Sequence, residues 1–336
     1  MKIFKIASII FVLVFISTGI LIAGAEPIEL ILGHTGSGRG NPITEGGLAW
    51  ADEIERLSNG SIIVNVFPDH QLGGERDLME GIQGGTIDLY IGSTGMASNF
   101  IPEYKIFNLP FLFVSPEHTV AVLSGSIGER LSSFADKYGF KGMGIGGPGF
   151  RMPMNSKRPI KTPDDFKGLK FRCMEIPMHL ATYKALGASP VPIASPELYT
   201  ALQLGTVDGN EQTPSMTLTK GFAEIQDYYT IVPVLLNGDV FVMNPAKFDS
   251  LSKEQQEIVV KAAKVGVEAL DNSFINDDQK AFSALSEAGM NIYQPTTEER
   301  QLFVDATQVV WDEFLPDFSK EVQDIALEIK EMGKKY

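Results

Sequence analysis

Cysteine is almost absent from this chain. The 336 residues contain a single one, Cys173. One cysteine excludes an internal disulfide and a cysteine-rich metal site. Histidine is also rare, and none of the four stands at a metal-binding spacing such as H-E-x-x-H: His34, His70, His118 and His179. We therefore expect each histidine at the surface or in a loop, and we expect neither a bound metal nor a cofactor.

Positive charge is in short supply. The chain has 28 Lys and Arg residues against 42 Asp and Glu residues, a formal net charge of −14. This acidity argues against nucleic acid or an anionic membrane surface as a partner. A local basic pocket can still bind a small anion.

Long hydrophobic runs are confined to the N-terminus. Two lysines precede an apolar run over residues 6–22, and Ala23-Gly24-Ala25 follows it. This pattern predicts a signal peptide at residues 1–25, cleaved after Ala25, and therefore a periplasmic or extracytoplasmic protein. An uncleaved anchor is the alternative, although the run is short for a membrane span. The remaining chain is long enough for two domains.

Motifs of catalysis are missing as well. The sequence has no G-x-S-x-G elbow and no P-loop, and Cys173 is expected to be a small buried side chain in a strand. One nucleotide-like pattern exists, G-x-G-x-x-G at residues 142–147 within KGMGIGGPGFR. That motif needs a helix directly after its glycines, but Pro148 and Gly149 follow instead. An exported NAD-dependent α/β enzyme therefore stays only as an alternative class, and we expect no catalysis.

Hydrophobic periodicity predicts an α/β fold. A strand at Ile28–Leu32 leads into an amphipathic helix at Ile43–Leu57, and a second strand follows at Ser61–Pro68. Farther along, Ser252 and Gln255 form a capping box that opens a helix expected to run to Gly289. At 1.5 Å per residue this helix spans roughly 50 Å, longer than one lobe, so it can brace two.

A last helix is predicted to begin near Thr297. The apolar positions that we expect it to turn inward are Leu302, Phe303, Ala306, Val310 and Phe314.

An internal sequence repeat suggests that the fold contains a duplication. LMEGIQGGTID at residues 78–88 matches LYTALQLGTVD at residues 198–208, and the two copies lie 120 residues apart. Each copy is predicted as a short helix stopped by glycine and followed by a strand. The segments after the two strands, residues 90–94 and 209–213, would then be counterparts. In open α/β sheets, such strand ends are where ligands bind.

Two arginines stand out near the middle of the chain. Arg172 alternates with apolar neighbours in a predicted strand, and Arg151 follows the glycine-rich segment. A guanidinium offers a planar fork of donors that suits a carboxylate. A surface salt bridge is the alternative for either residue.

Residues 150–213, from FRMPMNSKRP to VDGNEQT, resemble the solute receptors of TRAP transporters, the DctP-type substrate-binding proteins. FPDHQLGGERDLMEGIQGGTIDL at residues 67–89 and IFNLPFLF at residues 106–113 support the resemblance, which covers essentially the whole mature chain. It implies a two-lobed periplasmic-binding-protein-like α/β fold with hinge strands and a long helix spanning both lobes. It also implies a monomer that closes on an organic acid and delivers it to one small and one large membrane subunit.

The resemblance also implies where the lobes and the site lie. Lobe I would comprise residues 26–148 and 238–277, and lobe II residues 149–237 and 278–336. The arginine of the family's G-L-K-x-R motif, which pairs with the ligand carboxylate, falls on Arg172, and a second basic position falls on Arg151. Further ligand-binding positions fall on Thr35, Glu75, Ser93, Ser195 and Gln212.

Two of these positions depart from the family pattern. Gln212 stands where the family often has Asn, and Ser195 stands where some members carry an aromatic ring. The polar set favours a sugar acid such as a hexuronate as the ligand. A C4-dicarboxylate or a 2-oxo acid is the alternative.

Overall fold

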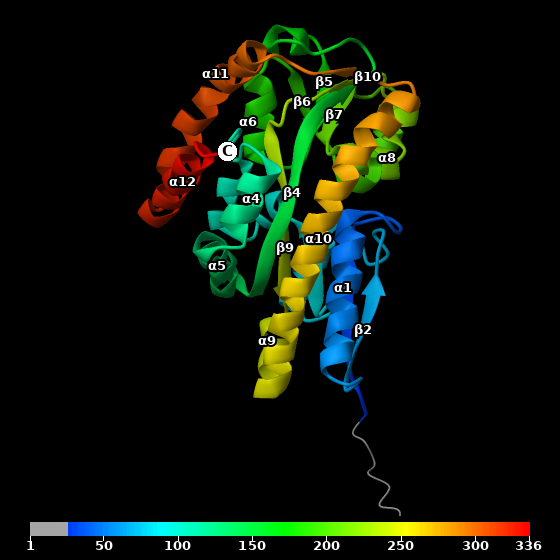
Figure 1. Ribbon diagram of the computed structural model, residues 1–336, viewed down its shortest axis with the longest axis vertical. Helices are drawn as coiled ribbons and strands as arrows, with labels where there is room; N and C mark the ends of the chain where they lie inside the picture. The colour runs from blue at the N-terminus through cyan, green and yellow to red at the C-terminus, as the bar shows by residue number, and fades with distance from the viewer. Residues whose placement is uncertain (1–25) are drawn as a thin grey trace, which may run out of the picture.

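The computed structural model describes residues 26–336, so the predicted signal peptide at residues 1–25 lies outside the described residues. The described chain is an α/β structure in which helices cover a single mixed sheet of ten strands (Figure 1). Within residues 26–336, no helix is both long and apolar enough to cross a lipid bilayer.

The strands are short except where the chain passes between the two ends of the molecule. They are β1 (Ile28–His34), β2 (Ile62–Phe67), β3 (Leu89–Ser93), β4 (Lys141–Asn155), β5 (Lys170–Cys173), β6 (Ser189–Pro192), β7 (Gly209–Gln212), β8 (Tyr228–Thr230), β9 (Leu235–Met243) and β10 (Asn291–Tyr293).

The α-helices are α1 (Pro42–Leu57), α2 (Glu75–Gly84), α3 (Thr94–Ala97), α4 (Pro116–Leu123), α5 (Ser126–Ser133), α6 (Pro177–Ala185), α7 (Leu198–Gln203), α8 (Pro214–Thr219), α9 (Pro245–Ser250), α10 (Lys253–Glu287), α11 (Thr297–Phe314) and α12 (Lys320–Gly333). Short 3₁₀ helices are η1 (Pro102–Asn108), η2 (Phe134–Tyr138), η3 (Pro163–Phe166), η4 (Ser195–Glu197), η5 (Phe222–Glu224) and η6 (Leu315–Asp317).

The sheet has two halves joined by long strands. Its main order is β2-β1-β3-β9-β4-β7-β5-β6, with β8 on β4 and β10 on β8. We call β1, β2 and β3 the first half, and β5, β6, β7, β8 and β10 the second half. Strand β4 pairs with β9 from Lys141 to Arg151 and with β7 from Met152 to Asn155. In Figure 1 it runs from the lower part of the molecule, the first half, into the upper part, the second half. The predicted two-lobed fold with hinge strands is therefore confirmed.

The internal sequence repeat corresponds to a structural repeat. Helix α2 leads to β3 in the first half, and α7 leads to β7 in the second half. Asp88, at the end of the first copy, accepts a hydrogen bond from the amide of Ile31 on β1 at 2.8 Å. Asp208, its counterpart, accepts one from the amide of Lys170 on β5, also at 2.8 Å. The shared Thr-x-Asp ending thus ties each copy to a neighbouring strand in the same way.

The long helix predicted after Ser252 is α10, which has 35 residues and ends two residues before Gly289. The Ser252–Gln255 capping box is present, with the Ser252 side chain accepting from the Gln255 amide. Figure 1 shows α10 beside β4, crossing from the first half to the second. Where α10 crosses α1, Gly266 faces Gly46, and a Cβ on Gly266 would lie 3.0 Å from the Gly46 carbonyl oxygen. Glycine at both positions allows the two helices to touch.

The glycine-rich segment 141–149 is part of β4 and not a nucleotide-binding loop. The strand continues to Asn155, so no helix begins where a pyrophosphate would need one. A Cβ on Gly146 would lie 2.7 Å from the Asp271 carboxylate, and one on Gly149 would lie 2.7 Å from the Phe274 ring. Both partners are on α10. The glycines therefore let the long helix lie directly against the crossing strand, which removes the basis of the NAD-enzyme alternative.

Two side-chain predictions are wrong. Leu302 is 46% exposed, because the buried face of α11 passes through Phe303 and Val310, and a shift of one residue rotates a side chain by about 100°. The prediction that the histidines lie at the surface or in loops is also wrong: His34, His118 and His179 are buried, and only His70 is half-buried. Burial lowers the pKa of His34 to about 4. Cys173, in contrast, is buried in β5 as predicted.

Candidate functional site

All seven predicted site residues line one small cavity between the two halves of the sheet. Its volume is about 30 Å³. Its walls are formed by Thr35, Ile43, Glu75, Ser93, Arg151, Arg172, Met174, Ser195, Gln212, Met216, Lys220, Asn237 and Asp239. The polar members come from loops and strand ends of both halves, as expected for the ligand edge of an α/β sheet.

Arg172 is fixed in place by the strand that carries it. On β5 its neighbours Phe171 and Cys173 point into the core, so Arg172 points the other way, and it is only 3% exposed. Its Nε donates a hydrogen bond to the Ile193 carbonyl oxygen at 2.9 Å. Burial lowers the pKa of Arg172, and nearby Glu211 opposes that shift. The fork of the guanidinium is thereby oriented before any ligand arrives.

Arg151, on β4, is backed by a buried carboxylate. Its NH1 lies 3.6 Å from Oε1 of Glu211 on β7, and the same oxygen lies 3.6 Å from Nδ1 of His179. Burial alone would raise the pKa of Glu211, but His179 and the two arginines lower it. Burial lowers the pKa of His179. Glu211 therefore stays ionised behind the arginines and stabilises their charge.

Lys220 is a third cation in the cavity, and sequence reasoning missed it. It follows α8, and its Nζ lies 3.4 Å from Oγ of Ser195. Burial of the amine lowers its pKa to about 8, with Glu75 opposing the shift and the arginines adding to it. In the sequence, a lysine directly before a glycine is typical of the end of a helix. Nothing in that pattern indicates a ligand-binding residue.

Two acidic residues face the cavity from the side of β3. Glu75 begins α2 and accepts a hydrogen bond from the Ser93 amide at 2.9 Å. Asp239, also missed from the sequence, lies on β9 between Ser93 of β3 and Gly146 of β4. It is 1% exposed, and neither carboxylate oxygen has a hydrogen-bond partner among the described residues. Burial raises the pKa of Asp239 well above its ordinary range, and Glu75 raises it further.

The remaining polar groups are uncharged. Thr35 and Ser93 are buried on the side of the first half. Gln212 lies at the end of β7, and its Oε1 accepts the Thr213 amide at 3.1 Å, so its amide nitrogen is the group available to a ligand. The cavity is therefore lined by basic residues from β4, β5 and the end of α8, by acidic residues from α2 and β9, and by neutral donors and acceptors. Such a site suits a ligand with a carboxylate at one end and hydroxyls at the other.

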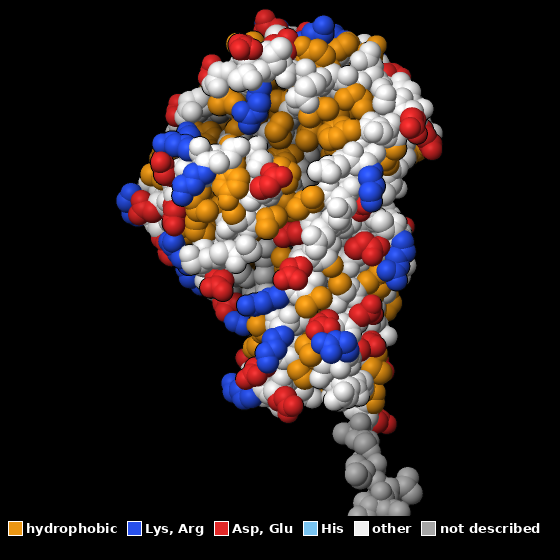
Figure 2. Space-filling model, viewed as in Figure 1, with side chains coloured by type: hydrophobic (Ala, Val, Ile, Leu, Met, Phe, Trp, Pro, Cys, Tyr) orange, Lys and Arg blue, Asp and Glu red, His pale blue; other side chains and the backbone are white. Residues whose placement is uncertain are grey.

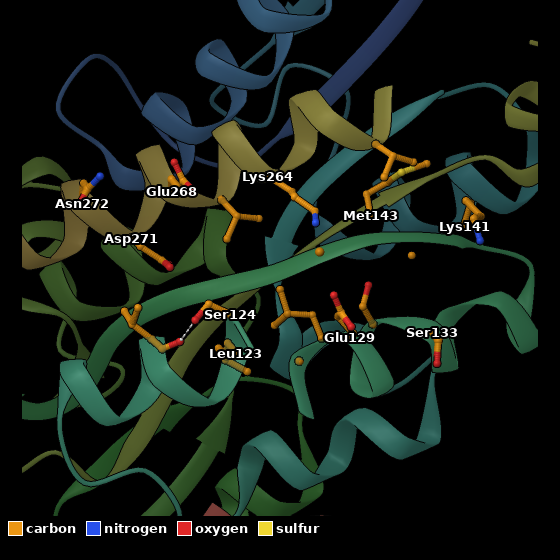
Figure 3. A pocket seen from close by; sticks show the side chains of 18 of the residues that line it. Leu123, Ser124, Glu129, Ser133, Lys141, Met143, Lys264, Glu268, Asp271 and Asn272 are labelled. Carbon is orange, nitrogen blue, oxygen red and sulfur yellow. Dashed lines mark hydrogen bonds between the residues drawn. The ribbon is translucent and has the colours of Figure 1, made fainter. Parts of the chain in front are cut away.

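A larger hollow of the described chain lies elsewhere. It is an open groove of about 730 Å³ between α10 and the α4–α5 pair, with β4 as its floor. Figure 3 shows Lys264, Glu268 and Asp271 on the α10 side and Glu129 on the α5 side. On the molecular face of Figure 2, hydrophobic side chains gather along this strand while charges of both signs surround them. The groove contains no arginine and no buried cation cluster, so its chemistry does not suit a small acid.

Comparisons with known proteins identify the family to which this chain belongs. Residues 32–317 match the family described as bacterial extracellular solute-binding protein, family 7, named DctP. A solute-binding protein of Verminephrobacter eiseniae is 38% identical over 271 residues, 81% of this chain and 80% of that protein. The 2,3-diketo-L-gulonate-binding periplasmic protein of Escherichia coli is 32% identical over 267 residues, 79% of this chain and 81% of that protein.

Among solved structures, a TRAP periplasmic solute-binding protein from Polaromonas bound to D-erythronate superposes with a TM-score of 0.85. It is 32% identical, and the match covers 90% of this chain and 98% of that chain. The family match spans most of the chain, and the sequence relatives and the similar solved structures are solute-binding proteins of the same kind. This chain belongs to the DctP family of bacterial extracellular solute-binding proteins, the solute receptors of TRAP transporters.

Proposed function

We propose that this receptor captures a small sugar acid by pairing the ligand carboxylate with Arg172 and by closing its two lobes. The observation that carries the proposal is the cavity itself, in which Arg172, Arg151 and Lys220 converge. Pairing in this water-poor site is stronger than in water, and an unpaired arginine there is costly. Thr35, Glu75, Ser93, Ser195 and Gln212 supply the polar contacts for the hydroxyls.

The relatives support a polyhydroxy acid. The Escherichia coli relative is named for 2,3-diketo-L-gulonate, and the Polaromonas structure contains D-erythronate. Both are acids with a single carboxylate. A hexuronate or an aldonate fits the same chemistry, whereas a C4-dicarboxylate and a 2-oxo acid remain the alternatives within the class.

The small size of the cavity supports a movement of the two lobes. A volume of about 30 Å³ holds one or two waters, whereas ligand sites are typically about 300–1,000 Å³. The lobes must therefore part to admit a sugar acid. The proposed lobes are residues 26–148 with 238–277, and residues 149–237 with 278–336. Ligand favours the closed state by the difference between its affinities for the two states.

The proposal also covers the localisation of the receptor and its protein partners. The receptor works as a monomer outside the cytoplasmic membrane, after removal of a signal peptide at residues 1–25, and catalyses no reaction. It delivers its ligand to one small and one large membrane subunit of a TRAP transporter.

The direct test is Arg172→Ala, with the ligand chosen by a thermal-shift screen of uronates, aldonates, C4-dicarboxylates and 2-oxo acids. Calorimetry should show that Arg172→Ala weakens binding at least about 100-fold, because one partner of a buried charge pair is lost. Arg130→Ala, which removes a half-exposed arginine paired with Glu328, serves as the control and should bind normally. Near-normal affinity in a folded Arg172→Ala protein would rule out the carboxylate clamp. A shift with NAD and with no acid would contradict the receptor function.

A further inference from the structure

Asn237 is an uncharged polar residue in the wall of the cavity. It lies on β9, where it pairs with Gly149 of β4, and it is only 2% exposed. Asp239, two residues farther along the same strand, also lines the cavity, and side chains two residues apart in a strand share a face. Asn237 therefore faces the cavity, and its amide is shielded from bulk water.

The amide of Asn237 is only half satisfied. Its Nδ2 donates to the Sδ of Met216, another residue of the cavity wall, at 3.8 Å. A thioether sulfur can accept a hydrogen bond but cannot donate one, so this contact holds the NH₂ end of the amide toward Met216. The other end, Oδ1, is buried and has no hydrogen-bond partner within residues 26–336. Because buried polar atoms are normally satisfied, this oxygen indicates a donor that arrives with the ligand.

Other uncharged acceptors of the cavity already receive hydrogen bonds from the protein. They are Oε1 of Gln212, bonded by the Thr213 amide, Oγ of Ser93, bonded by the Gly95 amide, and Oγ of Ser195, bonded by Lys220. Asn237 also differs from Asp239, whose pKa is raised well above its ordinary range by burial, because an amide does not titrate. The need of Asn237 for a donor is therefore the same at every pH.

The chemistry of that donor follows from the groups that organic acids carry. A hydroxyl donates, whereas an ionised carboxylate and a keto oxygen only accept, and a methylene does neither. An acid without a hydroxyl at this point would leave Oδ1 of Asn237 buried and unpaired. A site built to bond a ligand hydroxyl discriminates strongly against analogues that lack it, because its own polar group then stays unpaired.

We propose that Asn237 is a specificity-determining residue that accepts a hydrogen bond from one hydroxyl of the bound acid and so selects hydroxy acids over oxo and deoxy acids. This inference rests on the proposed function of the cavity as the acid-binding site. It adds to that function the reason why an acid of the same size without this hydroxyl binds more weakly.

The test is a double-mutant cycle between Asn237 and the hydroxyls of the ligand, with galactonate and each of its monodeoxy derivatives as probes. Calorimetry on the full mature chain should show that one derivative binds at least about tenfold more weakly than galactonate. Asn237→Leu keeps a similar volume and removes the amide. In this variant galactonate should weaken by a similar factor, and the same derivative should bind as well as galactonate. Asn291→Leu, at an exposed site on β10, is the control and should leave all affinities unchanged.

Each outcome decides the inference. If every deoxy derivative loses as much affinity in folded Asn237→Leu as in the unmodified chain, Asn237 contacts no ligand hydroxyl and the inference is overturned. If Asn237→Leu does not fold, Asn237→Ala takes its place in the same cycle.

The choice of probe does not affect the decision. If another hydroxy acid, such as erythronate or glucuronate, binds more tightly than galactonate, that acid and its monodeoxy derivatives are used in the cycle. A chain that binds only acids without hydroxyls, such as pyruvate or succinate, overturns the inference and leaves the receptor function intact. If the unmodified chain binds no acid of any class, the proposed function itself fails.

Discussion

Lys220 shows how a single buried amine can make acid binding depend on pH. Its pKa is lowered to about 8, mainly by burial, so the side chain is charged at neutral pH and loses its charge in mildly alkaline solution. Only the charged amine strengthens binding of a carboxylate. A carboxylate bound beside it would in turn raise this pKa.

We therefore expect ligand affinity to be constant below about pH 7 and to fall as the pH rises through 8 and above. Calorimetry between pH 6 and pH 10 measures this profile. Lys220→Gln should bind about tenfold more weakly at pH 7, consistent with the loss of one charged hydrogen bond, and its profile should be flat. A sloping profile in the variant would assign the pH dependence to another group.

At the level of single residues, the sequence predicts only part of the candidate site. Arg172 and Arg151 could be assigned because each stands in a recognisable motif, and the structure places both in the cavity with the five other predicted residues. Lys220 and Asp239 stand in ordinary-looking segments. Asp239 reaches the cavity only because β9 inserts between β3 and β4, a pairing that no local pattern encodes.

Among the elements, α10 packs against α1 through a close contact that requires glycine. A Cβ on Gly266 would lie 2.9 Å from the Trp50 Cβ and 3.0 Å from the Gly46 carbonyl oxygen. Gly266→Val should therefore destabilise the fold by about 2 kcal/mol, since an overpacked helix contact must shift to accommodate it. Thermal unfolding measures the loss. Gly84→Ala, in α2 with open space around the added methyl, is the control and should be neutral or slightly stabilising. Equal stabilities of the two variants would show that α1 and α10 can move apart freely.

Asp271 links α10 to the crossing strand. Its Oδ1 accepts the Gly147 amide at 2.7 Å, and burial raises its pKa to about 6. Because the folded pKa lies above the ordinary value of 3.8, the stabilising contribution of this group is complete below pH 3.8. It is lost as the pH rises through about 6, and the shift corresponds to about 3 kcal/mol at most.

Asp271→Asn keeps the acceptor oxygen and removes the titrating charge. The variant should therefore be more stable than the unmodified chain at pH 7.5, and its advantage should shrink toward pH 4.5. Melting temperatures of both proteins across this range test the expectation. An advantage that is the same at every pH would point to packing and not to the charge of Asp271.

The elements themselves were more predictable than their packing. The helix predicted at Ile43–Leu57 is α1, and the capping box at Ser252 marks the start of α10, because caps and hydrophobic periodicity are local. The face of α11 was not predictable in the same way. Leu302 and Phe303 are both apolar, and only the position of the neighbouring α6 decides which of them is buried.

For the whole molecule, the crossing strands determine how the two lobes can move. The β4–β9 ladder is interrupted between Gly146 and Gly149, where the register shifts. Gly147 within that break has a φ of 92°, a conformation that favours glycine. A break in pairing next to a permissive residue allows the strand to bend there while the ladder on either side stays intact. The break lies beside the cavity lined by Arg172 and Arg151, since Gly146 pairs with Asp239, which lines the same cavity.

Binding of an acid should therefore make the whole receptor more compact. Small-angle scattering of the mature chain should show a smaller radius of gyration at saturating ligand than without it, because the ligand contacts both walls only when the lobes are together. Arg172→Ala, tested with the same acid at a concentration that saturates only the unmodified chain, should show no change, since the variant stays largely unoccupied. The two measurements separate closure from binding. If calorimetry detects tight binding to the unmodified chain while its radius of gyration stays constant, the lobes do not close on the ligand, and entry must instead occur by local movement of the cavity wall.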